Sequence, residues 1–103
     1  MELTDNTLNN TLENNKVVLV DFWAEWCGPC RILGPTIEEL ETDFKDKAFI
    51  GKINISENPE SPSKYGVRSI PTVIIYKNGE EVERVVGLRD KTFYSDKINY
   101  YLN

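Results

Sequence analysis

The stretch Val17–Cys30 reads VVLVDFWAEWCGPC, and it joins a strand-like segment to the only two cysteines of the 103-residue chain. The apolar run from Val17 to Ala24 is nearly continuous. Such a run predicts a strand buried on both faces, at the centre of a sheet with helices on each side. Cys27 and Cys30 follow it directly. Two intervening residues allow the sulfurs either to bond to each other or to stay free, so the sequence predicts a reversible thiol–disulfide pair.

Composition limits the class of protein around this stretch. The hydrophobic content of 40% suffices for one core, and nothing resembling a linker or repeat divides the sequence, so we expect a single domain over residues 1–103. The net charge of −5 argues against nucleic acid as a partner. No signal peptide or membrane span is visible, and we expect a cytoplasmic protein away from membranes.

Hydrophobic periodicity and turn residues predict the other elements around this central strand. They are a helix capped by Thr4 or Asp5 and running to about Asn14, a helix after Pro29 kinked by Pro35, strands over 48–55, 72–76 and 81–86, a short helix or turn over 57–65, and a last helix capped by Asp90. Asn78-Gly79 predicts a hairpin between the last two strands. The order predicts an α/β fold whose mixed sheet lies between helices.

The position of Cys27 explains why the pair can be reactive. A cysteine between a strand and a helix lies near the helix N-terminus, where unpaired N–H groups and the helix dipole favour the thiolate. Cys30 lies one turn on and can reach Cys27; Gly28 permits the tight approach and Pro29 suits the first turn. Two alternatives stay open, a zinc half-site completed by an oligomer and incidental core thiols. The chain offers no histidine and no other cysteine, and we predict no metal site.

Asp21 and Lys52 are charged residues within apolar strands. Burial would raise the pKa of Asp21 towards neutrality and suit it to proton exchange, whereas an edge position facing water would leave it without a role. Lys52 either pairs with Asp21 or extends to solvent. Pro71 enters a strand, where a cis peptide bond would fix a turn, although local sequence favours trans.

The stretch Val20–Cys30 resembles the active-site signature of the thioredoxin family. Further segments match the family in order: Lys52–Ile55, Asn58-Pro59, Lys64–Arg68, Ile70–Thr72, Lys77–Gly79 and Val86-Gly87. The resemblance implies the thioredoxin fold, with a mixed sheet of four to five strands flanked by helices on both faces. It covers nearly the whole chain from Val17 onward.

The resemblance also implies roles for single residues. Cys27 would be the exposed nucleophile and Cys30 the buried resolving thiol. Asp21 would be the acid–base group with Lys52 nearby. A cis Pro71 would belong to a substrate groove, with Trp23 packed beneath the site and Pro35 supporting the structure. The groove would be lined by Trp26, Gly28, Pro29, Ile70, Pro71 and Gly87.

The activity implied is reduction of protein disulfides through the Cys27–Cys30 pair. The chain would work as a monomer, bind no cofactor, and be reduced again by a thioredoxin reductase that uses FAD and NADPH. An oxidase or isomerase is one rival function, although such relatives usually carry a histidine between the cysteines. A binding module without turnover is the other.

The sequence departs from the family pattern at four places. The amino-terminal segment is short, which predicts a reduced or missing first edge strand. Ser69 stands where glycine is common, Arg31 where lysine is commoner, and Ser56 where an acid is frequent. These departures concern the choice of target rather than the disulfide chemistry.

Overall fold

The computed structural model describes residues 1–103 and contains one five-stranded sheet in the order β1-β3-β2-β4-β5. The elements are β1 (Glu2–Leu3), α1 (Leu8–Asn14), β2 (Val17–Trp23), α2 (Gly28–Asp43), β3 (Phe49–Asn54), α3 (Glu60–Lys64), β4 (Thr72–Lys77), β5 (Glu80–Val86) and α4 (Lys91–Leu102). β1 and β3 run parallel to β2, whereas β4 is antiparallel to it. The predicted mixed α/β sheet is confirmed, and the predicted reduced edge strand is the two-residue β1.

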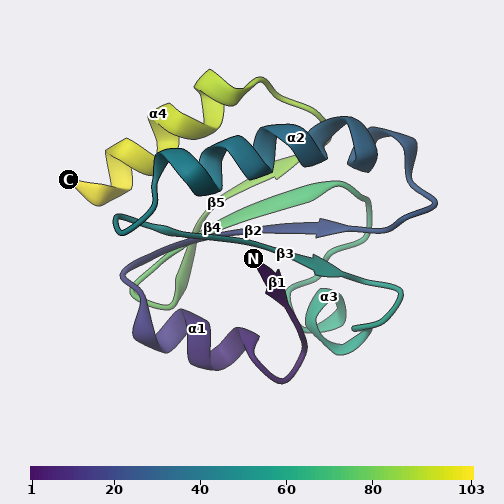
Figure 1. The fold of residues 1–103 in the computed structure, drawn as a ribbon. Helices are drawn as coiled ribbons and strands as arrows, with labels where there is room; N and C mark the ends of the chain where they lie inside the picture. Colours follow the sequence, from purple (N-terminus) through teal and green to yellow (C-terminus); the bar gives the residue numbers. More distant parts are fainter.

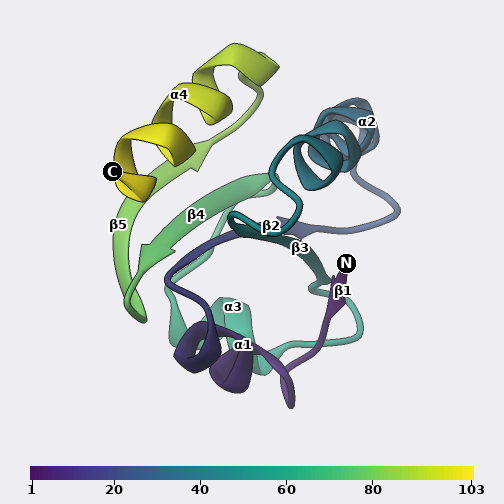
Figure 2. The same ribbon diagram turned by 60° about the vertical axis from the view of Figure 1, so that its left-hand side comes forward.

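The helices form two layers around this sheet. α2 and α4 cover one face, and α1 and α3 cover the other (Figures 1 and 2). The cysteines lie at the start of α2, which therefore packs on only one face of the sheet (Figure 1). None of the helices combines the length and the apolar character that crossing a membrane would require.

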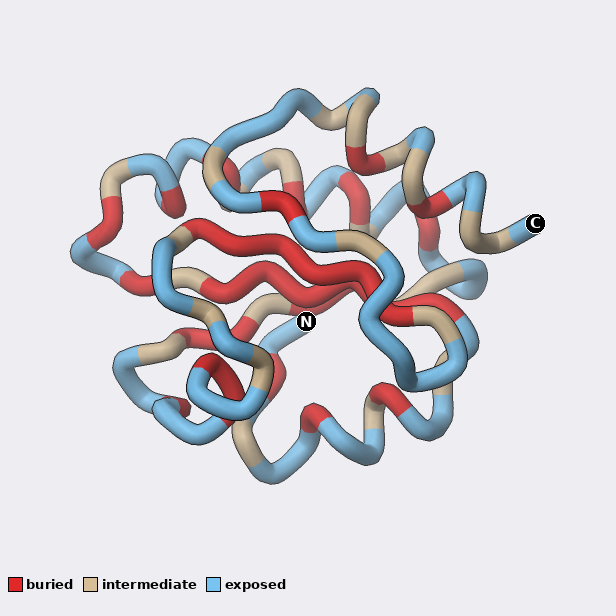
Figure 3. Tube along the Cα trace, turned by 180° about the vertical axis from the view of Figure 1, so that it is seen from behind, coloured by how far each residue is buried: buried red, intermediate tan, exposed pale blue.

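Strand β2 supplies side chains to both faces, because successive residues of a strand point in opposite directions. Val17 and Leu19 belong to the core beneath α2 and α4, whereas Val18, Val20 and Phe22 belong to the core beside α1. Seen from behind, the strands at the centre of the sheet are almost entirely buried (Figure 3). The prediction that β2 is buried on both faces is confirmed, and its alternation directs Asp21 to the face covered by α2 and α4.

The hairpin and the last helix follow local sequence signals. Asn78 and Gly79 both have positive φ, 54° and 83°, as a tight hairpin turn between β4 and β5 requires. The Asp90 carboxylate accepts a hydrogen bond of 3.0 Å from the Phe93 amide and caps α4, as predicted. Helix α4 then buries Tyr94 and Ile98 against the sheet.

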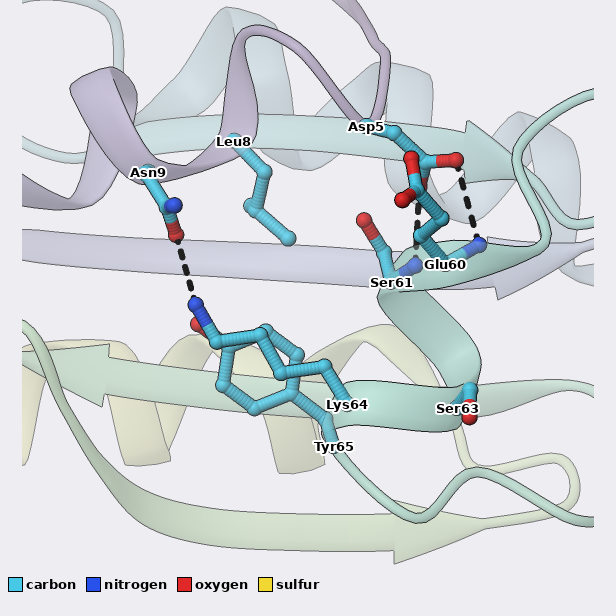
Figure 4. A pocket seen from close by; sticks show the side chains of 8 residues that line it. All are labelled: Asp5, Leu8, Asn9, Glu60, Ser61, Ser63, Lys64 and Tyr65. Atoms are coloured by element: carbon cyan, nitrogen blue, oxygen red, sulfur yellow. Dashed lines mark hydrogen bonds between the residues drawn. The ribbon is translucent and has the colours of Figure 1, made fainter.

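The predicted cap of the first helix is wrong. Helix α1 begins at Leu8, and neither Thr4 nor Asp5 caps it. The Asp5 carboxylate instead accepts hydrogen bonds from the amides of Glu60 (3.1 Å) and Ser61 (2.8 Å) at the start of α3. These bonds lie beside a hollow of about 430 Å³ between α1 and α3, on the face of the sheet opposite α2 (Figure 4). Pro59 precedes α3, and its side chain has no group that can cap the helix. The Asp5 carboxylate therefore accepts the hydrogen bonds of the first two amides of α3.

We predict that Asp5→Ala lowers the free energy of unfolding by about 1 kcal/mol, because it leaves two amides of α3 without an acceptor. Urea denaturation measures the change. Glu13→Ala is the matched control, since Glu13 is an exposed carboxylate in α1. Equal losses in the two variants would contradict the capping role.

Candidate active site

Cys27 and Cys30 form a disulfide at the start of α2, with their Cα atoms 5.3 Å apart. Cys27 is the N-cap residue, and its Sγ accepts a hydrogen bond of 3.2 Å from the Cys30 amide. Pro29 lies in the first turn, where its missing N–H costs nothing. The predicted place of Cys27 at a helix N-terminus is confirmed. After reduction, the same amide and the helix dipole would stabilise a Cys27 thiolate.

The expectation that Cys27 is exposed is wrong for this oxidised form. Only 6% of Cys27 is exposed, against 2% of Cys30. The loop before β4 lies against Cys27 and places the Ile70 carbonyl oxygen 3.8 Å from its Sγ. Cys27 remains more accessible than Cys30, but most of it is covered, in part by the loop that carries Ile70.

Three residues that the sequence analysis predicts for a groove, Ile70, Pro71 and Gly87, come together near this disulfide. The Ile70–Pro71 peptide bond is cis, as the family resemblance implies and against the odds from local sequence. The Gly87 amide donates a hydrogen bond of 2.9 Å to the Pro71 carbonyl, and Gly87 has a φ of 95° that favours glycine. These contacts place Ile70, Pro71 and Gly87 on the side of Cys27 that faces β4 and β5.

Trp26 flanks the disulfide and is 71% exposed. Its indole Nε1 donates a hydrogen bond of 3.2 Å to the Ser56 hydroxyl, just after β3. The Ser56 amide in turn donates to Asn54 Oδ1 at 2.9 Å. The serine that departs from the family pattern therefore holds the exposed indole. Gly28 and Pro29 complete the predicted groove set at the start of α2.

Asp21 is buried, with 1% of its surface exposed, so the alternative of an edge position facing water is wrong. Its Oδ1 has no hydrogen-bond partner and no contact with solvent. Desolvation of the carboxylate raises the pKa of Asp21 to about 7, and the positive charge of Lys52 opposes part of that rise. The carboxyl can therefore gain or lose a proton near neutral pH.

Lys52 neither forms a direct ion pair with Asp21 nor extends freely into solvent. The two residues are register partners on β3 and β2. The Lys52 Nζ instead lies 4.7 Å from the centroid of the Trp23 ring and 3.7 Å from the Glu2 carboxylate. The cation acts on Asp21 through space, while Trp23 and the short strand β1 hold it in place.

A cavity of about 220 Å³ is lined by both Asp21 and Cys30. Its lining consists of Asp21, Trp23, Cys30, Arg31, Gly34, Pro35, Glu38 and Lys52. No group of three or more His, Cys, Asp or Glu side chains is arranged to hold a metal ion. The site is therefore a disulfide with an ionisable carboxyl behind it, across a shared cavity.

Comparison with known proteins agrees with this geometry. The Thioredoxin family model matches residues 1–100. The chain belongs to the thioredoxin family. It is 56% identical to a thioredoxin from Rickettsia bellii over 88 residues, which cover 85% of this chain and 84% of that protein. It is 49% identical to a thioredoxin from Rickettsia prowazekii over 98 residues, covering 94% and 93%.

A solved structure of a mutant thioredoxin from Halobacterium salinarum NRC-1 matches with a TM-score of 0.91 and 40% identity, covering 100% of this chain and 90% of that one. The predicted thioredoxin fold is thereby confirmed. The function is that of a thioredoxin thiol–disulfide oxidoreductase with protein-disulfide reductase activity. The redox-active disulfide carries the electrons, and no bound cofactor is used.

Three residues near the thioredoxin site were not singled out from the sequence. Gly34 and Glu38 line the cavity with Cys30, and their spacing of four residues along α2 places all three on one side of the helix. Tyr94 on α4 is fully buried, and its hydroxyl has no partner. Burial, followed by the nearby charge of Asp21, raises the pKa of Tyr94. Helical spacing from Cys30 could have identified the first two, but no local signal marks Tyr94.

We predict that Asp21→Asn changes how stability depends on pH. Because folding raises the pKa of Asp21 from 3.8 to about 7, the folded state holds a proton that the unfolded state releases. The stability of the parent therefore falls as pH rises from about 4 to about 7, by as much as about 4 kcal/mol. The asparagine variant lacks this loss.

Denaturation of the oxidised proteins between pH 4 and pH 8 measures this effect. The stability advantage of Asp21→Asn should be small near pH 4, grow through neutrality and level off above it. Glu13→Gln neutralises an exposed carboxylate and is the control. An advantage for Asp21→Asn that does not vary with pH would refute the raised pKa.

Proposed function

We propose that Cys27 attacks target disulfides and that Cys30 resolves the mixed disulfide. The observation that carries this assignment is the hydrogen bond from the Cys30 amide to Cys27 Sγ at the start of α2. It gives Cys27 a stabilising environment for negative charge that Cys30, one turn inside the helix, lacks. The greater exposure of Cys27 supports the same order of events.

The reaction then proceeds in two exchanges. The Cys27 thiolate attacks one sulfur of the target disulfide, forms a mixed disulfide and releases the other target sulfur as a thiolate, which takes up a proton. Cys30 loses its proton and attacks Cys27 Sγ. The Cys27–Cys30 disulfide forms, and the second target sulfur leaves with its electron pair and is protonated. Two electrons pass to the target.

We assign to Asp21 the proton that Cys30 releases. Asp21 and Cys30 line the same cavity, and the pKa of about 7 lets the carboxyl take up and return a proton at neutral pH. Lys52 tunes this equilibrium from its place over Trp23. Pro35 belongs to the cavity wall and supports its shape.

The target chain, in this proposal, lies across the groove formed by Trp26, Gly28, Pro29, Ile70, Pro71 and Gly87. The loop before β4 places the Ile70 carbonyl oxygen 3.8 Å from Cys27 Sγ, which supports docking beside Pro71. The exposed Trp26 indole offers apolar surface on the other flank. Disulfide-containing proteins are therefore the proposed targets.

We further propose that a thioredoxin reductase containing FAD returns the electrons from NADPH. Residues 1–103 would act as one monomeric domain, because one sheet with a core on each face accounts for the packing of α1, α2 and α4. A reducing compartment such as the cytoplasm suits this cycle. Coupled turnover of NADPH with a thioredoxin reductase and insulin tests the whole proposal, and no NADPH oxidation above a control without the chain would refute it.

We predict that Cys27→Ser lowers insulin reduction in the presence of dithiothreitol to the rate without protein, because no nucleophile remains at the groove. Cys30→Ser should still attack but should accumulate mixed disulfides, which appear as reducible adducts on non-reducing gels. The same variant with Cys27 also replaced by serine is the control and should form none. Turnover by Cys27→Ser at the parent rate would exclude it as the nucleophile.

We also predict that Asp21→Asn slows the release step more than the first attack. The expected effect on release is roughly 10²-fold near neutral pH, since the general base that shares a cavity with Cys30 is lost. Stopped-flow tryptophan fluorescence follows both steps. Equal slowing of attack and release would argue against the proton role, because Asp21 is proposed to serve Cys30 alone.

A further inference from the structure

Gly34 lies in the interior of α2, where glycine is less favourable than alanine. Pro35 follows it directly, and a Cβ atom before a proline ring is crowded in a helix, which is a local reason for a small residue. Its φ is not among the positive values of the chain, so no left-handed backbone conformation requires glycine. Apart from its chain neighbours and the backbone of its own helix, a Cβ atom at this position would meet no atom within 4 Å. The surroundings of α2 therefore leave open space beside position 34.

The open space beside Gly34 belongs to the cavity behind the disulfide. Gly34 lines this cavity of about 220 Å³ together with Asp21 and Cys30. It lies one helical turn beyond Cys30 and one turn before Glu38, which is exposed at the surface. A side chain at position 34 would therefore project into the space that separates the buried carboxyl from the surface residues of α2.

We propose that the missing side chain of Gly34 keeps a water passage to Asp21 open, through which the carboxyl exchanges its proton with solvent. This inference rests on the proposed proton role of Asp21 and identifies Gly34 as a positioning residue for it. Gly34 does not touch the reacting sulfurs. Gly34 instead determines how much water can lie next to the Asp21 carboxyl, to which we assign the proton of Cys30.

The need for water follows from the contacts of the carboxyl. No protein group donates a hydrogen bond to the Asp21 Oδ1, and this atom is sealed from solvent. A buried carboxylate without donors is strongly unfavourable, so hydration through the cavity is what makes ionisation near neutrality accessible. The polar lining can supply the partners that an ordered water requires. Narrowing the cavity should therefore penalise the ionised form.

The titratable and charged groups around Asp21 come from three elements. Cys30, Arg31 and Glu38 of α2 line the same cavity, Lys52 of β3 is the charge that opposes the rise of the Asp21 pKa, and Tyr94 of α4 interacts electrostatically with the carboxyl. The register partner on β4 is Val73, which carries no charge. In the oxidised protein the cysteines do not titrate, so a change at Gly34 can be read without interference from the thiols.

The test compares Gly34→Ala and Gly34→Val in the oxidised, full-length protein. The carbon-13 chemical shift of the Asp21 carboxyl is followed by NMR from pH 4 to pH 10. We expect the midpoint to rise by roughly half a pH unit in the alanine variant and further in the valine variant, as water is displaced. Thr36→Ala is the control, because it replaces another residue of α2 that does not line the cavity, and its midpoint should equal that of the parent.

The outcome separates this inference from the proton role of Asp21. If the midpoint rises and the release step slows in the same order, both stand. If the midpoint rises while release keeps the parent rate, the water passage stands and the proton role of Asp21 fails. If both Gly34 variants are folded by their amide spectra and titrate like the parent, the water passage is refuted. Helix propensity favours alanine over glycine, whereas the new Cβ before Pro35 acts against it, so the amide spectrum of each variant is recorded before the titration.

Discussion

The hydrogen bond from the Cys30 amide to Cys27 Sγ is the interaction on which the site depends. A helix leaves its first amides unpaired, and here a sulfur takes the place of the usual capping oxygen. The same atom therefore completes the helix end and carries the chemistry. This arrangement requires α2 to begin immediately after the central strand, because only that junction places Cys27 outside the helix and Cys30 one turn inside it. Stabilising the helix end and stabilising a Cys27 thiolate become one requirement.

The burial of Asp21, in contrast, destabilises the fold. The alternation of β2 directs its carboxyl into the core beneath α2 and α4, where no protein donor meets it. The fold tolerates this cost because each face of the sheet has its own buried apolar cluster, one of 12 and one of 9 residues. The destabilised carboxyl lies at the edge of the larger cluster, next to the cavity that it shares with Cys30. The burial of Asp21 therefore lowers the stability of the fold beside Cys30, where the proposed proton transfer requires a carboxyl with a pKa of about 7.

The sequence predicted those features that depend on neighbours along the chain. Strand β2, the hairpin at Asn78-Gly79 and the Asp90 cap follow from periodicity and turn chemistry, and the structure confirms them. The cis bond before Pro71 was predicted from the family resemblance, because local sequence favours the trans form.

Features that depend on distant contacts could not be predicted in the same way. Asp5 caps a helix that begins 55 residues later, so the local signal for α1 was misleading. Lys52 is positioned by Trp23 and Glu2, and the cover over Cys27 comes from the loop carrying Ile70. The two sides of the disulfide are built from separate residues: the hollow beside Trp26 includes Ser56 and Asn54, and it shares no residue with the cavity behind Cys30. The proposed target surface and the cavity to which we assign the proton are therefore separate, so departures from the family pattern such as Ser56 and Ser69 would change target choice and leave the lining of the cavity intact.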